Sequence, residues 1–137
     1  MKKKTSLFTI IALAGLMLFG FQSCSQYPDN EGITLVSKTN RLSQTWKLEN
    51  YKLNDTDLTS IVAGYTESFT KEGVYSYKWG LLDGTGAWTF QNSSAEIKII
   101  GIDDQQSKTL TILKLEEKYF WYYYMSGTDR HEYHMIK

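Results

Sequence analysis

The C-terminal segment holds the residues whose types could bind a metal ion: His131, Glu132 and His134. Imidazole and carboxylate are common zinc ligands, and a spacing of three residues places two ligands on one face of a helix. The segment 130–136 has the alternation of a β-strand, however, and a strand points these two histidines to opposite faces. The chain has no other histidine and one cysteine, so a tetrahedral site lacks ligands. We therefore expect no metal and no cofactor.

Other chemistry has no recognisable signature in this sequence. We find no Ser-His-Asp arrangement, no phosphate-binding loop and no dinucleotide fingerprint, so we expect a protein that is not an enzyme. All fifteen acidic residues follow Cys24, whereas Lys2, Lys3 and Lys4 precede it. The part after Cys24 is therefore mildly acidic, which argues against nucleic acid as a partner, because phosphate binding needs a basic patch.

Cys24 ends an N-terminal segment with the features of an export signal. Three lysines are followed by an uncharged apolar stretch over residues 7–21, shorter than the ~20 residues of a membrane-spanning helix. The sequence Phe21-Gln22-Ser23-Cys24 resembles a bacterial lipobox, although Phe21 replaces the usual Leu and Gln22 the common small residue. The resemblance implies a diacylglycerol on the Cys24 sulfur, with acyl chains such as palmitate, and cleavage before Cys24. The alternative is an ordinary secretory signal that leaves Cys24 as a free thiol.

This interpretation divides the chain into a signal peptide (1–23), a lipidated cysteine with a flexible tether (24–39) and one folded domain (40–137). The lipid would attach the domain to the membrane of a bacterial cell envelope. Ser25, where Asp would favour inner-membrane retention in similar lipoproteins, indicates the outer membrane. With a single cysteine the domain has no internal disulfide.

Apolar spacing near two predicts an all-β domain. The expected strands span 44–53, 65–70, 74–79, 87–91, 96–102, 109–115, 119–125 and 130–136, with turns that include 71–73 and 82–86. About eight antiparallel strands with short turns favour an up-and-down barrel, with an open sandwich as the alternative. Residues 54–64 have helical spacing and predict a short helix or loop near one barrel mouth, either as a plug or as a lid.

Three segments resemble motifs of bacterial lipocalin-like domains, in the same order. They are 42–48 (L-x-G-x-W-x-L in the family), 69–75 (F-x-x-D/E-G-x-Y) and 86–90 (G-x-W-x-F), and the resemblance covers residues 40–137. Gln44 replaces the usual Gly of the first motif. The resemblance implies an up-and-down barrel that binds a small apolar molecule.

Two sets of residues are candidates for a binding role. A set inside the barrel would hold the ligand, with two polar residues that we expect to face inward beside the aromatic ones: Trp46, Asn50, Glu67, Phe69, Trp88 and Phe90. A second set on one face of the aromatic strand 119–125 would form an outer interaction surface: Tyr119, Trp121 and Tyr123. The first set predicts a ligand-binding lipoprotein, and the second predicts a packed barrel that contacts an envelope protein or a glycan.

Overall fold

The structure is a computed structural model that describes residues 36–102 and 106–137. The expected signal peptide, Cys24 and most of the expected tether lie outside the described residues. The elements in chain order are α1 (Lys38–Leu42), β1 (Thr45–Leu53), β2 (Thr56–Asp57), the 3-10 helix η1 (Thr59–Val62), β3 (Thr66–Phe69), β4 (Val74–Trp79), β5 (Leu82–Gln91), the short 3-10 turn η2 (Asn92–Ser94), β6 (Glu96–Ile102), β7 (Gln106–Leu115), β8 (Tyr119–Ser126) and β9 (Asp129–Ile136). No helix among these elements is long and apolar enough to cross a membrane.

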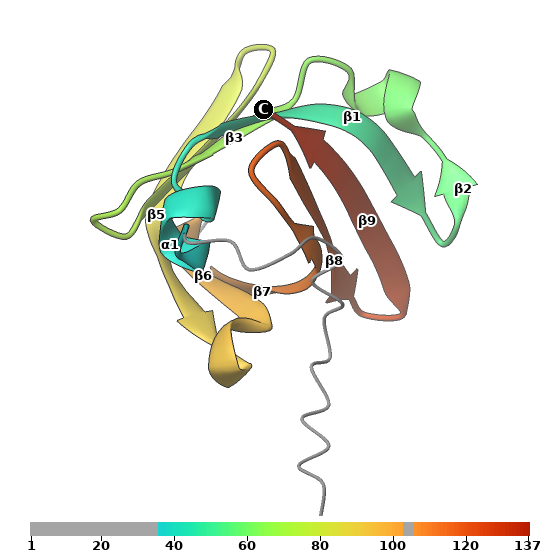
Figure 1. Cartoon of the computed structure of the whole chain (residues 1–137). Helices are drawn as coiled ribbons and strands as arrows, with labels where there is room; N and C mark the ends of the chain where they lie inside the picture. Colours follow the sequence, from blue (N-terminus) through green and yellow to red (C-terminus); the bar gives the residue numbers. More distant parts are fainter. Residues whose placement is uncertain (1–35, 103–105) are drawn as a thin grey trace, which may run out of the picture.

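The strands form a closed antiparallel barrel, as Figure 1 shows. Every strand from β3 onward pairs with the next one along the chain, β1 pairs with β3, and β9 returns to pair with β1. The two-residue strand β2 pairs with β1 alone and adds to its outer end. Eight strands therefore close the barrel, which confirms the prediction of an all-β, up-and-down, lipocalin-like barrel.

The strand β5 is longer than the sequence predicts. We expected a turn over residues 82–86, but the chain turns earlier, at Gly80 and Leu81, and residues 82–86 pair with β4. Gly84 and Gly86 lie opposite Tyr77 and Tyr75 in this ladder. A Cβ atom on Gly84 would collide with the Tyr77 ring. Gly84 is thus in the strand because it leaves room for an aromatic ring, and Gly86 because it lies close to the Ile100 backbone; neither forms a turn.

The helix α1 closes one end of the barrel. Leu42 is fully buried, and its carbonyl accepts a hydrogen bond from the Trp46 indole at 3.0 Å. The Arg41 guanidinium donates to the Leu115 carbonyl at the end of β7. The core of this end is aromatic, with the rings of Trp46 and Phe120 at 5.5 Å. This helix begins at Lys38, inside the segment we expected to be a tether.

The segment 54–64, expected as a short helix or loop near a barrel mouth, contains β2 and η1. Leu58 and Val62 pack against the core, while Ile61 is exposed. The segment follows β1 on the side opposite α1, because β1 runs from the closed end to the open one (Figure 1).

A β-bulge in β1 corrects one prediction. Leu48 pairs with Met135 and Asn50 pairs with His134, so one residue of β1 is unmatched between these two pairs. The extra residue reverses the alternation of side chains in the rest of the strand. Tyr51 therefore faces the core and Asn50 faces outward, and the expectation that Asn50 lies inside the barrel with Trp46 is wrong.

Candidate functional site

The barrel has a cleft of about 850 Å³ at the end opposite α1. Its walls come from β4 to β8 and from the residue before β3, and most of the lining side chains are aromatic or carry a hydroxyl group. The lining residues are Tyr65, Tyr75, Tyr77, Trp79, Leu82, Ile102, Ser107, Lys108, Thr109, Thr111, Tyr123, Tyr124, Met125 and Ser126. The arrangement suits a small molecule that has both an apolar body and polar groups.

The space exists because of the sequence of β5. The face of β5 toward the interior carries Trp88 and Phe90 near the closed end, but Gly84 and Gly86 near the open end. The Tyr77 ring of β4 lies over Gly84 instead of filling the lumen. The barrel is consequently packed solid at one end and hollow at the other.

A buried carboxylate lies behind the tyrosines of the cleft wall. Glu67 on β3 is 1% exposed, and its Oε1 atom accepts hydrogen bonds from the hydroxyl groups of Tyr65 (2.7 Å), Tyr75 (2.8 Å) and Tyr122 (2.9 Å). Its Oε2 atom is also buried and has no hydrogen-bond partner among the described residues. Tyr65 and Tyr75 line the cleft, so two hydroxyl groups separate the carboxylate from it.

Burial and charge fix the protonation state of these tyrosines. Burial raises the pKa of Tyr65 far above its usual value, and the adjacent Glu67 carboxylate raises it further. The same two causes, in the same order, raise the pKa values of Tyr75 and Tyr122. All three hydroxyl groups therefore keep their protons at physiological pH and donate hydrogen bonds to Glu67.

The opposite wall of the barrel contributes a cation and a histidine. The Lys108 ammonium lies 4.1 Å from the centroid of the Tyr124 ring, within the range of a cation–π contact. The same tyrosine stacks on His131, with ring centroids 4.7 Å apart and planes at 1°. His131 Nδ1 is hydrogen-bonded to the Tyr51 hydroxyl at 2.8 Å, and burial lowers its pKa. This imidazole is thus neutral at physiological pH.

The wall between β7 and β8 is open beside the cleft. The ladder between these strands ends at the pair Thr111–Tyr123, although β7 begins at Gln106 and β8 continues to Ser126. Residues 107–109 and 124–126, which line the cleft, face each other across this gap without backbone pairing between them in the described structure. We call this gap in the backbone pairing the seam; the side chains of Lys108 and Tyr124 meet across it.

The topology is the one that the lipocalin-like resemblance implies. Sequence comparison adds no family: a scan against protein-family models found no match for this chain, and a search of curated proteins found none either. The functional argument therefore rests on the cleft itself.

The residues predicted to hold a ligand do not line the cleft. Trp46, Phe69 and Trp88 are buried in the core, and Phe90 packs against it. Glu67 faces inward as expected, but it lies behind Tyr65 and Tyr75. From the sequence, the tyrosines of β4 are strand residues without a site, and Lys108 precedes the expected strand 109–115. The signal that could have found them is the pair Gly84 and Gly86, two residues without side chains on one face of a strand.

The outer aromatic residues of β8 face away from the core, whereas Phe120 and Tyr122 are fully buried. The rings of the outward-facing residues are covered by cationic and imidazole side chains of neighbouring strands. Trp121 stacks on His134 at 4.2 Å, Lys114 lies over the rings of Tyr119 and Trp121, and Arg130 lies 4.3 Å from the Tyr123 ring centroid. The expected outer aromatic face exists, but the chain's own residues cover much of it.

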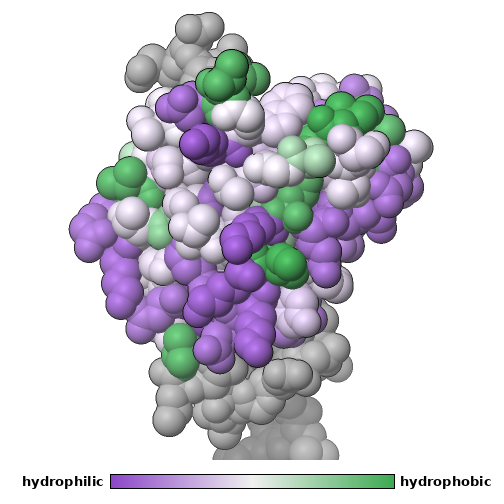
Figure 2. Space-filling model, turned by 90° about the horizontal axis from the view of Figure 1, so that it is seen from above, coloured by the Kyte–Doolittle hydropathy of each residue, from purple (hydrophilic) through white to green (hydrophobic). Residues whose placement is uncertain are grey.

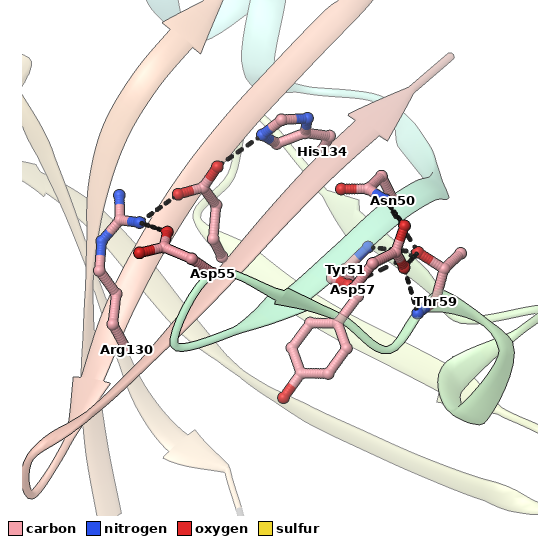
Figure 3. Close-up of polar contacts among 8 residues, drawn as sticks. Asn50, Tyr51, Asp55, Asp57, Thr59, Arg130 and His134 are labelled. Carbon is pink, nitrogen blue, oxygen red and sulfur yellow. Dashed lines mark hydrogen bonds and ion pairs between the residues drawn. The ribbon is translucent and has the colours of Figure 1, made fainter.

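Two polar clusters surround the outward part of β1 and β9 (Figure 3). In the first, Asn50 donates to Asp57 at 2.9 Å and to Thr59 at 3.0 Å, and so holds β2 and η1 against β1. In the second, Glu132 bonds both Arg130 and His134. His134 thus lies outside the barrel and His131 inside, which confirms that the two histidines point to opposite faces of the strand.

Proposed function

We propose that this chain is a ligand-binding barrel protein that holds a small molecule in the cleft. The observation that carries the proposal is the cleft volume of about 850 Å³. Sites for small molecules usually occupy roughly 300 to 1,000 Å³, and a barrel of eight strands is often filled completely by its own side chains. The hollow end is therefore a specific property of this sequence.

The lining residues favour a ligand with a flat apolar body and polar groups over a purely apolar one. Five tyrosines and Trp79 offer ring faces and hydroxyl oxygens, and Lys108 adds a charge. Aromatic walls bind flat molecules through stacking. The expectation of a small apolar ligand is thereby refined.

A role as a packed interaction module has less support. Figure 2 shows one face of the molecule on which hydrophobic residues lie in separate small groups between hydrophilic ones. The outer aromatic rings of β8 are covered by Lys114, Arg130 and His134. Interaction sites of soluble proteins more often have a continuous apolar patch.

Native mass spectrometry of the exported chain tests the binding function. The chain from residue 24 with Cys24→Ser is exposed to a bacterial envelope lipid extract, and we expect a retained small molecule. Thr109→Trp adds a large side chain to the cleft lining and should abolish retention, whereas Thr89→Trp, on the exposed side of β5 and away from the cleft, should not. Loss of retention in both variants, or no retention by any of the three chains, would argue against the proposal.

We also propose that Cys24 carries a lipid anchor that attaches the barrel to the envelope, at the outer membrane. The support is the sequence around Cys24. Two or three acyl chains bind a membrane stably at ~0.8 kcal/mol per buried CH₂ group, so the barrel itself would need no membrane contact.

Metabolic labelling with a fatty-acid probe tests the anchor. The wild-type chain should be labelled and should fractionate with the outer membrane, and Cys24→Ala should show neither property. Equal labelling of both chains would contradict lipidation at Cys24.

A further inference from the structure

We infer that the cleft selects molecules that carry a hydrogen-bond donor, a primary amine above all, because the tyrosine hydroxyls in its wall donate their hydrogen bonds to Glu67. This inference rests on the proposed binding function and names the class of ligand. Its basis is the geometry around a carboxylate that is 1% exposed.

The first step concerns the direction of the hydroxyl groups. A tyrosine hydroxyl has one proton to donate and lone pairs to accept. Tyr65 and Tyr75 donate theirs to the Glu67 Oε1 atom at 2.7 and 2.8 Å. Their own oxygens lie 3.3 Å apart, and neither has a second proton for a ligand. Tyr75 is fully buried, so the Tyr65 oxygen is the acceptor that this wall offers to a ligand.

The second step concerns the charge behind the hydroxyl groups. In the described structure the hydrogen-bond partners of Glu67 are three tyrosine hydroxyls, and none is a cationic side chain. The Oε2 atom is buried and has no hydrogen-bond partner among the described residues. The carboxylate polarises the hydroxyl groups that donate to it, because hydrogen bonds in a chain strengthen one another. Hydrogen bonds in which one partner is charged are the stronger ones, so an ammonium gains more here than a neutral hydroxyl.

The third step concerns the rest of the cleft. Tyr65 and Tyr77 stack with ring centroids 6.1 Å apart, beside the same acceptor, and can hold the apolar body of the ligand. The Lys108 ammonium belongs to β7, four strands away around the barrel, and lies over Tyr124. The positive charge in the lining is thus on the other wall, and the donor end of a ligand is directed toward the Tyr65 hydroxyl.

Three matched probes test the inference by NMR titration of the chain from residue 24 with Cys24→Ser. Benzyl alcohol has a donor, benzyl methyl ether has the same ring and oxygen without one, and benzylamine has a charged donor. We expect the alcohol to bind about tenfold more tightly than the ether, which corresponds to one well-formed hydrogen bond, and the amine to bind most tightly. Equal affinities for alcohol and ether would overturn the inference and leave the binding function intact. Binding by none of the three would overturn both.

Two variants connect the preference to Glu67. Glu67→Gln keeps a carbonyl oxygen that can accept the three tyrosine hydroxyls at the Oε1 position, but it removes the carboxylate charge. The preference for benzylamine over benzyl alcohol should then fall, because a charged donor gains most from a charged partner. An unchanged preference for the amine in a folded Glu67→Gln chain would overturn the inference.

A second, matched pair serves if Glu67→Gln does not fold. Tyr65→Phe removes a hydroxyl that both bonds Glu67 and lines the cleft, whereas Tyr122→Phe removes one that bonds Glu67 but does not line the cleft. Only Tyr65→Phe should reduce the preference for the alcohol. Equal preference in the two variants would contradict the role of the cleft hydroxyl groups.

Discussion

Glu132 is a nearly buried carboxylate on the outside of the barrel, and its contacts make stability depend on pH. It bonds Arg130 and His134, the latter at 2.8 Å. Burial alone would raise its pKa, but the hydrogen bond from His134 and the charge of Arg130 outweigh burial and lower it. A carboxylate with a lowered pKa stabilises the folded state above its unfolded pKa, about 4.3, and loses that contribution as the pH falls through the folded value.

Urea unfolding of wild type and Glu132→Gln at several pH values checks this. We expect the wild type to be more stable at neutral pH, and the difference to shrink as the pH falls below about 4. Glu49→Gln on the exposed side of β1 is the control and should show little difference at any pH. A Glu132→Gln difference that is constant with pH would contradict the assignment.

At the scale of the element, β5 shows how glycines shape the cleft. A Cβ at Gly84 would meet the Tyr77 side chain, which can move, whereas a Cβ at Gly86 would meet the backbone carbonyl of Ile100, which cannot move without breaking the sheet. The two glycines lie in the same strand and on the same face of it, so each serves as a control for the other.

We expect Gly86→Ala to destabilise the fold by about 1–3 kcal/mol, as overpacking does, and Gly84→Ala to cost less. Gly84→Ala should instead push the Tyr77 ring into the cleft and weaken ligand retention. Urea unfolding measures the first effect and native mass spectrometry the second. Equal destabilisation with unchanged retention would contradict this division.

The strands were predictable because each has one face in the core. Side chains of a strand alternate between its two faces, so apolar residues such as Tyr75 and Tyr77, or Ile97 and Ile99, recur at every second position. This pattern does not depend on which strand lies beside it. The outward turn of Asn50 was not predictable, because the bulge depends on how β1 pairs with β9, a strand some 80 residues away. The site was missed for a related reason. In the sequence, a glycine such as Gly84 looks the same whether it lies in a turn or in a strand beneath a tyrosine ring.

For the whole molecule, the tyrosines of the interior predict how the barrel responds to alkali. Burial raises the pKa values of Tyr65, Tyr75, Tyr122 and Tyr133 well above 10, the value for exposed tyrosine, and neighbouring charges raise them further. A group whose folded pKa is raised keeps the folded state stable below the unfolded pKa and costs stability as the pH rises above it.

Ultraviolet absorbance and circular dichroism, recorded together as the pH rises above about 10, check this. The buried tyrosines should ionise in one step, together with loss of the sheet signal. Smooth ionisation of all ten tyrosines without unfolding would show that the interior is open to hydroxide.

The seam between β7 and β8 has a consequence for the length of molecule that the proposed site could accept. Where the ladder stops at Thr111 and Tyr123, the wall consists of side chains and not of paired backbone. A bound molecule need not end inside the barrel: a chain attached to its head could leave sideways between the two strands while the head stays against Tyr65. The fold would then select its cargo by the chemistry of one end and tolerate tails of many lengths.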